Sequence, residues 1–170
     1  YEIKNRLISY HKFNEKERLE PLLKRIEDGE NVALVSDAGT PGISDPGMIL
    51  INAVIERGLS LDVLPGPNAL LPAVILSGIG AGSFTFAGFL EGKKEEKRQR
   101  LRELLYGKEA LVFYMAPHRL LKELELMGSV LGDRPAALVK EISKVHQECI
   151  RGTLLTFCSL LTEDKIRGEF

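Results

Sequence analysis

Three loops in this sequence combine glycine, proline and small polar residues in a way that suits the binding of a small polar ligand. Each follows a short apolar run, and their sequences are SDAGTPGISDPG (36–47), LPGPNA (64–69) and FYMAPHR (113–119). Gly39 and Gly66 permit positive φ angles and close approach to the backbone, while Pro41 and Pro65 stiffen the path. A plain strand-to-helix connection explains any one loop equally well. Three such loops in succession favour a ligand site.

Several familiar site signatures do not occur in the sequence. It has no GxxxxGK[ST] phosphate loop, no GxGxxG dinucleotide fingerprint after a strand and no GxSxG nucleophile elbow. The three histidines and two cysteines are not spaced as metal ligands, so we expect no metal site. They are His11, His118, His146, Cys149 and Cys158.

The first half of the chain alternates helical and strand-like patterns. Leucine and isoleucine at helical spacing predict a helix over 14–29, with Asn14 as its N-cap and Gly29 after its end. The apolar run VALV (32–35) predicts a buried parallel strand. A second helix is expected from Asp45 or Pro46 to Gly58, capped by Asp45, followed by a strand in SLDVLPGP and a helix in NALLPAVILSG. This alternation is typical of an α/β layer.

The glycine-rich segment 78–82 is the expected boundary between two lobes, 1–80 and 81–170. After it we expect strands, helices and a final element in this order: strand 83–90, helix 93–108, strand 109–114, helix 120–128, strand 134–142, and in GTLLTF (152–157) a last strand or the approach to a helix.

The helix over 93–108 has an excess of arginine and lysine over acidic residues. Its default interpretation is a solvated face with pairs such as Glu96–Arg100. The alternative is contact with an RNA backbone. Phe84, Phe86 and Phe89 are expected in the core and not as a base-stacking surface.

Bulk composition excludes some classes of protein. The 170 residues are 44% hydrophobic and 28% charged, which suits a globular core, and the net charge of -1 gives no overall attraction to nucleic acid. No apolar run reaches the roughly 20 residues that span a bilayer, and no signal peptide is visible. Two scattered cysteines suit a reducing cytoplasm.

The segments VALVSDAGTPGISDPG, LPGPNALLPA, FTFAGFL, LVFYMAPHRL and ALVKEISKVHQE together resemble the S-adenosylmethionine-dependent tetrapyrrole-methylase-like superfamily. Within it the chain is similar to the branch that methylates the 2′-oxygen of a cytidine in small-subunit ribosomal RNA. Members that act on corrins or uroporphyrinogen carry a GGDP-type loop where this chain has AGTP. The resemblance implies a homodimer of two α/β lobes, with S-adenosyl-L-methionine in the cleft between them.

The resemblance also assigns roles to individual residues. The implied cofactor contacts are Ala38, Gly39, Thr40, Ile43, Asn68, Ala69, Tyr114, Met115 and Ala137. The weakly acidic ribose hydroxyl gains from a base or a cation as its proton leaves, and the candidates in the matched segments are Lys140, Glu141 and Asp37. A structural ion pair between Lys140 and Glu141 is an equally good interpretation. His118 and Arg119 are the candidates for contact with RNA phosphate.

Relatives in that branch begin with a strand, a GTPIGNL-type loop and a DTR segment, none of which occurs here, and IRGEF (166–170) resembles the start of their last strand. We therefore expect a fragment without its first strand and without full activity. Two other functions stay open. One is methylation of a tetrapyrrole precursor on the same fold, and the other is a non-catalytic domain that binds a nucleotide-like ligand.

Overall fold

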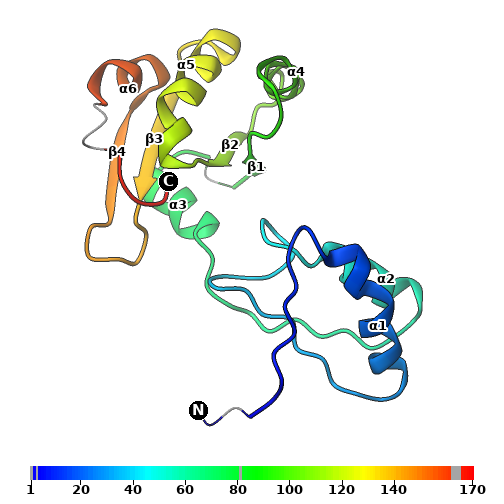
Figure 1. The fold of residues 1–170 in the computed structure, drawn as a ribbon. Helices are drawn as coiled ribbons and strands as arrows, with labels where there is room; N and C mark the ends of the chain where they lie inside the picture. The colour runs from blue at the N-terminus through cyan, green and yellow to red at the C-terminus, as the bar shows by residue number, and fades with distance from the viewer. Residues whose placement is uncertain (1, 3, 81, 162–165) are drawn as a thin grey trace. The chain divides into compact units, whose positions relative to one another are not determined.

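The computed structural model describes residues 2, 4–80, 82–161 and 166–170 (Figure 1). It divides into two compact units, Tyr1–Asn68 and Ala69–Phe170. The lobes predicted from the sequence, 1–80 and 81–170, meet at a later point in the chain, and that boundary remains a prediction.

The first unit is built on two helices, α1 (Glu15–Glu27) and α2 (Met48–Glu56). The apolar positions of α1 recur at helical spacing, and Leu22 and Leu23 pack with Leu50 and Val54 of α2 in a small buried cluster. Asn14 is the N-cap residue of α1, although its side chain makes no capping hydrogen bond, and Gly29 follows the helix with a φ of +91°. The predicted first helix is confirmed.

The two strands predicted in the first unit, over 32–35 and in SLDVLPGP, are not formed. Both segments lack a strand ladder among the residues described, and Val35, Val63 and Leu64 are 75%, 63% and 83% exposed. The prediction was wrong because an apolar run specifies only that a segment suits a strand. A strand exists only when a neighbouring strand pairs with it, and that partner is not given by the run itself.

The start of α2 also differs from the expectation. The helix begins at Met48 with Gly47 as its N-cap residue and no side-chain cap, so Asp45 does not cap it. Gly47 has a φ of +151°, and its N–H donates a hydrogen bond of 3.0 Å to Oε1 of Glu15. A carboxylate from α1 thus binds the N-cap residue, and α2 begins without a side-chain cap.

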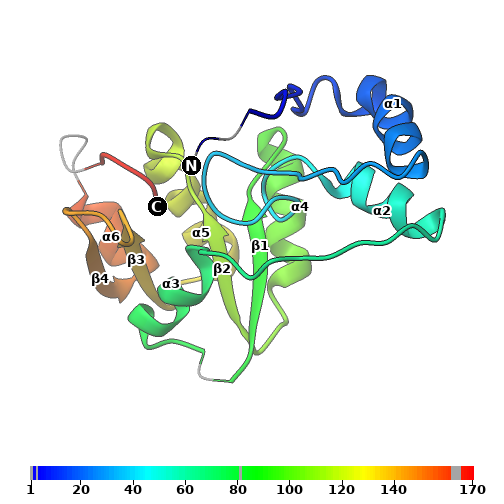
Figure 2. The same ribbon diagram turned by 90° about the horizontal axis from the view of Figure 1, so that it is seen from below.

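The second unit contains two small sheets with helices packed against them (Figure 2). One sheet pairs β1 (Phe84–Phe89) with β2 (Ala110–Tyr114) in parallel, and the other pairs β3 (Pro135–Lys140) with β4 (Glu148–Thr153) antiparallel. The helical elements are α3 (Leu70–Ser77), α4 (Lys94–Leu104), the short 3-10 helix η1 (Pro117–Arg119), α5 (Leu120–Leu131) and α6 (Leu154–Leu160). The elements predicted after residue 80 are confirmed, and β4 is an addition.

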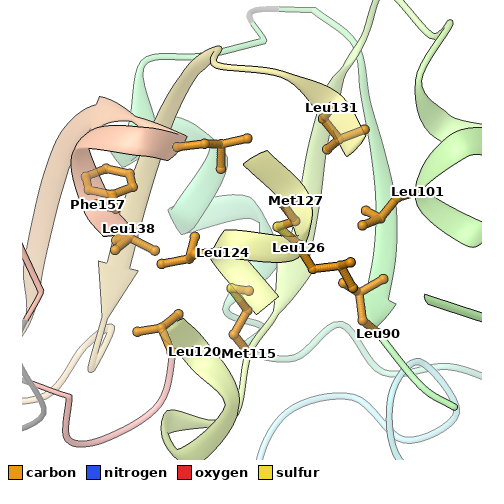
Figure 3. Close-up of a cluster of buried hydrophobic side chains, with 11 residues drawn as sticks. Leu90, Leu101, Met115, Leu120, Leu124, Leu126, Met127, Leu131, Leu138 and Phe157 are labelled. Atoms are coloured by element: carbon orange, nitrogen blue, oxygen red, sulfur yellow. The ribbon is translucent and has the colours of Figure 1, made fainter. Parts of the chain in front are cut away.

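Helix α5 lies at the centre of the core of this unit (Figure 3). Its buried side chains Leu120, Leu124, Met127 and Leu131 recur every three or four residues, and the helix packs against α4 and α6. Leu120 and Leu124 are almost fully buried, together with Leu101 of α4 and Phe157 of α6. Burying a leucine contributes about 1.5–3 kcal/mol, so this cluster is the main source of stability of the unit.

Helix α3 packs on β3 and β4 and so belongs to the second unit. Arg151 of β4 donates hydrogen bonds to the carbonyl oxygens of Leu76 and Ser77, the latter at 3.2 Å, and the thiol of Cys149 donates to Leu76 at 3.3 Å. These donors satisfy carbonyls at the end of a helix, where a cation is also favoured by the helix dipole.

The described end of the chain runs between the two sheets of the second unit. The carbonyl of Phe170 accepts a hydrogen bond of 2.9 Å from the N–H of Met115, and the carbonyl of Glu169 accepts one of 3.0 Å from the N–H of Glu141. The segment therefore joins the end of β2 to the end of β3, although it is not assigned as a strand. The start of a last strand expected at IRGEF is thus represented by these two backbone hydrogen bonds and not by a strand.

Candidate functional site

The first and second loops of the sequence come together in the first unit. A Cβ atom on Gly39 would lie 3.5 Å from the carbonyl oxygen of Pro67, and one on Gly66 would lie 3.8 Å from Oγ1 of Thr40. Gly39 has a φ of +82°, which glycine adopts readily. Two loops about 25 residues apart in the chain thus form one backbone-lined surface.

The predicted contacts on these loops are accessible. Ser36 holds the turn, since its hydroxyl donates to the carbonyls of Ala38 and Gly39 at 3.1 Å each. Asp37 and Ala38 are exposed, Thr40 is half-buried and the side chain of Ile43 is 62% exposed. The loop is therefore ordered by its own hydroxyl and leaves polar backbone and the Asp37 carboxylate to solvent.

A cavity of about 890 Å³ lies in the second unit and is lined by residues of its two sheets and of α3 and α5. Four of the predicted cofactor contacts line it: Ala69, Tyr114, Met115 and Ala137. Ligand sites of drug-sized molecules have volumes of about 300–1,000 Å³ and mostly apolar walls, and this cavity fits that description. The structure thus gathers residues from the end of the second loop, from β2 and from β3.

Tyr114 is held in place by aromatic neighbours. Its ring meets Phe86 edge-on with centroids 4.9 Å apart, and it meets Phe89 at 5.6 Å. Phe86 is half-buried as expected, whereas Phe89, also predicted in the core, is 39% exposed and lines the cavity. A fixed aromatic ring on a cavity wall is suited to stack against a planar base.

Sequence reasoning missed the polar side chains of the cavity wall, which are Ser77, Lys108, Glu109, Arg134 and Glu169. They come from the ends of different elements, so no local pattern in the sequence predicts that they line one cavity. Some are already engaged, because Glu109 accepts a hydrogen bond of 2.7 Å from the Thr85 hydroxyl and Arg134 donates to the Leu131 carbonyl at 2.8 Å.

Lys140 and Glu141, at the end of β3, have different partners from those expected. Nζ of Lys140 lies 2.7 Å from Oε2 of Glu148, its register partner on β4, and the predicted Lys140–Glu141 pair is not formed. The prediction failed because Lys140 meets its cross-strand partner on β4, whereas Glu141 lies beyond the end of β3 with a φ of +50° and has other partners. The Lys140 side chain is 21% exposed.

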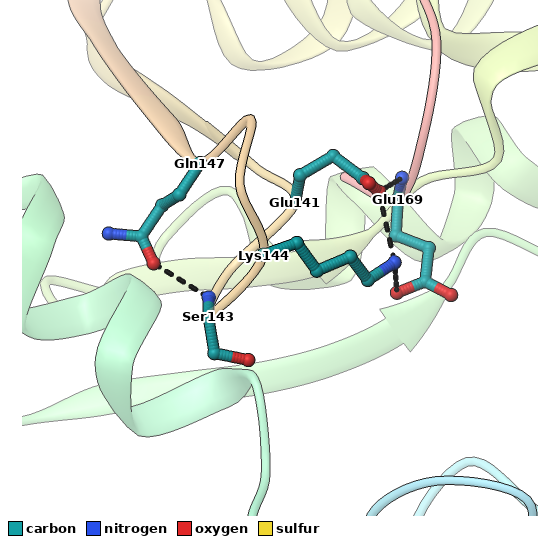
Figure 4. A network of polar contacts seen from close by, with 5 residues as sticks. All are labelled: Glu141, Ser143, Lys144, Gln147 and Glu169. Carbon is teal, nitrogen blue, oxygen red and sulfur yellow. Dashed lines mark hydrogen bonds and ion pairs between the residues drawn. The ribbon is translucent and has the colours of Figure 1, made fainter.

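Glu141 belongs to a separate polar network (Figure 4). Its Oε1 accepts hydrogen bonds from the backbone N–H of Glu169 at 2.8 Å and from Nζ of Lys144 at 3.1 Å. The backbone hydrogen bond, followed by the Lys144 contact, lowers the pKa of Glu141 below its ordinary value. A carboxylate stabilised in this way is a weaker base, so the geometry favours an anchoring role for Glu141 over proton transfer.

The loop that follows Glu141 has an unusual backbone. Glu141 and Ser143 have φ angles of +50° and +64°, the two positive values among non-glycine residues in the described part of the chain. The amide oxygen of Gln147 accepts a hydrogen bond of 2.7 Å from the N–H of Ser143 and holds the turn (Figure 4). Such conformations cost about 1–3 kcal/mol each and concentrate at functional sites.

His118 and Arg119 lie on η1, directly after the third loop. His118 is exposed, whereas Arg119 is half-buried with its Nε 3.9 Å from Oε1 of Glu123. Glu123 is a buried charged residue, and Lys97 of α4 contacts it at 2.5 Å. Lys97 and Arg119 therefore share one buried carboxylate.

The start of α4 differs from the expectation. Glu96 accepts a hydrogen bond of 2.5 Å from the N–H of Lys93 as part of a capping box, and the expected Glu96–Arg100 pair is not formed.

Within the described residues, no group of three or more histidine, cysteine, aspartate or glutamate side chains is placed to hold a metal ion. None of the helices described is both long enough and apolar enough to cross a membrane.

Comparison with known proteins identifies the class to which this fold belongs. The family model of the tetrapyrrole (corrin/porphyrin) methylases matches residues 4–157, and the chain belongs to this family. The methyltransferase CobJ, a solved structure, superposes with a TM-score of 0.63 at 21% identity over 90% of this chain and 68% of that one. This likeness confirms the α/β tetrapyrrole-methylase fold.

Curated relatives narrow the comparison. The chain is 44% identical over its full length to "Ribosomal RNA small subunit methyltransferase I" of Bacillus subtilis, of which it covers 58%. It is 38% identical to the protein of that name in Thermotoga maritima and covers 76% of it, and 42% identical to that of Mesomycoplasma conjunctivae, covering 71%. It spans about three fifths of the length of the first of these relatives.

Proposed function

We propose that the protein uses S-adenosyl-L-methionine to methylate small-subunit ribosomal RNA, at the 2′-oxygen of a cytidine ribose. Membership of the methylase family and the names of the relatives support the general reaction. The observation that carries the cofactor assignment is the cavity of about 890 Å³ on which Ala69, Tyr114, Met115 and Ala137 converge.

The residues fit the cofactor in size and in chemistry. The cavity offers an aromatic wall at Tyr114, mostly apolar side chains and a few polar ones. The loop pair around Gly39 and Gly66 presents bare backbone, which suits a zwitterionic amino-acid group. We assign Ala38, Gly39, Thr40, Ile43 and Asn68 to the cofactor as a proposal that rests on the match of these loops to the methylase family.

S-adenosyl-L-methionine supplies an electrophilic methyl group when bound. The role of the protein is to hold the ribose hydroxyl in line with that group and to manage the proton that leaves. We propose that Lys140 lies next to the ribose hydroxyl, because its ammonium would stabilise the developing alkoxide. Asp37 is exposed beside the cofactor loop and is the remaining candidate base, while Glu141 anchors the loop that follows Lys140.

RNA is the proposed partner, with His118 exposed beside the third loop and available to a phosphate. Arg119 is proposed to contact phosphate with its outer nitrogens, since its Nε faces Glu123. A homodimer and a cytoplasmic location complete the proposal, and sedimentation at micromolar concentration tests the dimer.

Transfer of a tritiated methyl group tests the function directly. We expect label in small ribosomal subunits and none in a tetrapyrrole precursor, and the reverse would make the protein a tetrapyrrole methyltransferase. Calorimetry with S-adenosylmethionine and S-adenosylhomocysteine completes the test. Micromolar binding of both without any transfer would support the non-catalytic alternative and contradict the proposal.

A further inference from the structure

A second cavity lies beside α1 in the first unit and is distinct from the loops of the proposed cofactor site. Its volume is about 370 Å³. It is lined by Arg6, Leu7, Ile8, Ser9, Arg18 and Arg25. Three of these six residues carry a positive charge and none carries a negative one. A hollow with this lining attracts anions.

Two of the arginines are set on α1 by the geometry of the helix. Arg18 and Arg25 are seven residues apart, which places them on one face about 10 Å apart along the axis. Nε and Nη2 of Arg25 both donate to Oε2 of Glu30, at 2.8 and 2.5 Å. This fork fixes the Arg25 side chain and compensates its charge.

Arg18 is in a different state. Its Nε is buried from solvent and has no hydrogen-bond partner among the described residues. A buried N–H without a partner costs about 1–3 kcal/mol, more for a charged group. An oxyanion in the adjoining hollow would instead meet the outer nitrogens of the Arg18 guanidinium, whose planar fork matches the oxygens of a phosphate.

We propose that this cavity is a phosphate-binding site, in which Arg18 and Arg6 hold a phosphodiester group of the RNA substrate. Leu7 and Ile8, which are 85% and 37% exposed, give the site an apolar side against which a ribose can pack. The identification of RNA as the source of the phosphate rests on the proposed function. The recognition of a phosphate group rests only on the arginines.

The test is the affinity of the protein for a single-stranded segment of small-subunit ribosomal RNA, measured by fluorescence anisotropy over a range of KCl concentrations. We expect Arg18→Gln to weaken binding about tenfold at low salt and to reduce the slope of log K against log[KCl] by about 0.7, the value for one phosphate contact on a single strand. Arg18→Lys keeps the charge without the fork and should recover only part of the loss.

Lys24→Gln is the matched control, because it removes one positive charge from the same helix outside the cavity. Arg6→Gln provides a second variant that lies outside any helix, so its effect cannot come from unfolding α1. Equal losses in Lys24→Gln and Arg18→Gln would overturn the proposal in favour of general electrostatic attraction. Unchanged binding in both arginine variants would also overturn it.

Titration with inorganic phosphate distinguishes the two sources of the group. If free phosphate binds the unmodified protein and Arg18→Gln abolishes this without changing RNA affinity, the RNA assignment is wrong. Methyl transfer is measured separately. Arginine-dependent RNA binding without methyl transfer would support the phosphate site while contradicting the proposed function.

Discussion

Lys97 of α4 and Glu123 of α5 form an ion pair of 2.5 Å that is largely removed from solvent, with the two side chains 12% and 4% exposed. The pair fastens the charged helix to the central helix of the second unit. Because Lys97 is engaged in this buried pair, not every basic residue of α4 is available to contact RNA. Lys97 serves the fold, and the exposed positions of α4 remain for other contacts.

Replacing Glu123 with glutamine is expected to lower the free energy of unfolding by about 3 kcal/mol, since it leaves the Lys97 ammonium buried without a counter-charge. Urea denaturation measures the change. The control is Arg100→Gln, which breaks a pair on α4 whose side chains are 51% and 50% exposed and should cost less than about 1 kcal/mol. Equal costs for the two variants would show that the burial of the Lys97–Glu123 pair has no energetic consequence.

In a full-length version of the protein, replacing Lys140 with alanine is expected to reduce methyl transfer by about 10² or more while leaving the affinity for S-adenosylmethionine unchanged. The assay is tritiated-methyl transfer to small ribosomal subunits, with calorimetry for the cofactor. Glu148→Gln is the matched control, because it removes the 2.7 Å ion pair but keeps the ammonium. If both variants lose activity equally, Lys140 acts only through its structural pair.

Gly47→Ala is expected to destabilise the first unit by more than 2 kcal/mol. A Cβ atom there would lie 2.8 Å from Cδ2 of Leu34 and 3.2 Å from the nitrogen of Gly42, at a φ of +151°. Gly29→Ala is the comparison, since its φ is +91° but nothing lies within 4 Å of the added atom, so only the conformational cost of about 1–2 kcal/mol applies. Thermal unfolding measures both, and a larger effect at Gly29 would contradict the close packing at Gly47.

The lowered pKa of Glu141 leads us to expect that the free energy of unfolding depends on pH in the acid range. Its folded-state pKa lies below the ordinary 4.5, so the ionised carboxylate stabilises the fold above that pH and loses this contribution as the pH falls through the lowered value. Glu141→Gln should therefore be less stable than the unmodified protein at pH 7, with a difference that shrinks below about pH 4.5. Urea denaturation at pH 7 and pH 3 measures it.

Glu169→Gln is the control for that series. It removes the 3.0 Å contact between Lys144 and the Glu169 carboxylate but leaves the Glu169 N–H that binds Glu141. The pH-dependent part should then persist. A Glu141→Gln difference that stays constant from pH 7 to pH 3 would mean that the backbone hydrogen bond does not hold the charged form.

The elements that the sequence predicted correctly are those with local causes. The spacing of its leucines and the position of Gly29 predict helix α1. Two apolar runs predict β1 and β2, which pair in parallel. Strand β4 escaped prediction because ECIRGT mixes charged, apolar and small residues without a clear period. Its identity as a strand comes from pairing with β3, which only the fold supplies.

The candidate site divides in the same way. Glycine and proline mark the loops around Gly39 and Gly66 because those conformations depend on the residue itself, so the sequence alone determined where backbone is offered to a ligand. Only the tertiary structure decided that Lys140 pairs with Glu148, that Glu141 is held by the Glu169 N–H, and that Tyr114 and Ala137 share one cavity. These relationships join residues far apart in the chain, and they exist only once distant strands and helices have packed.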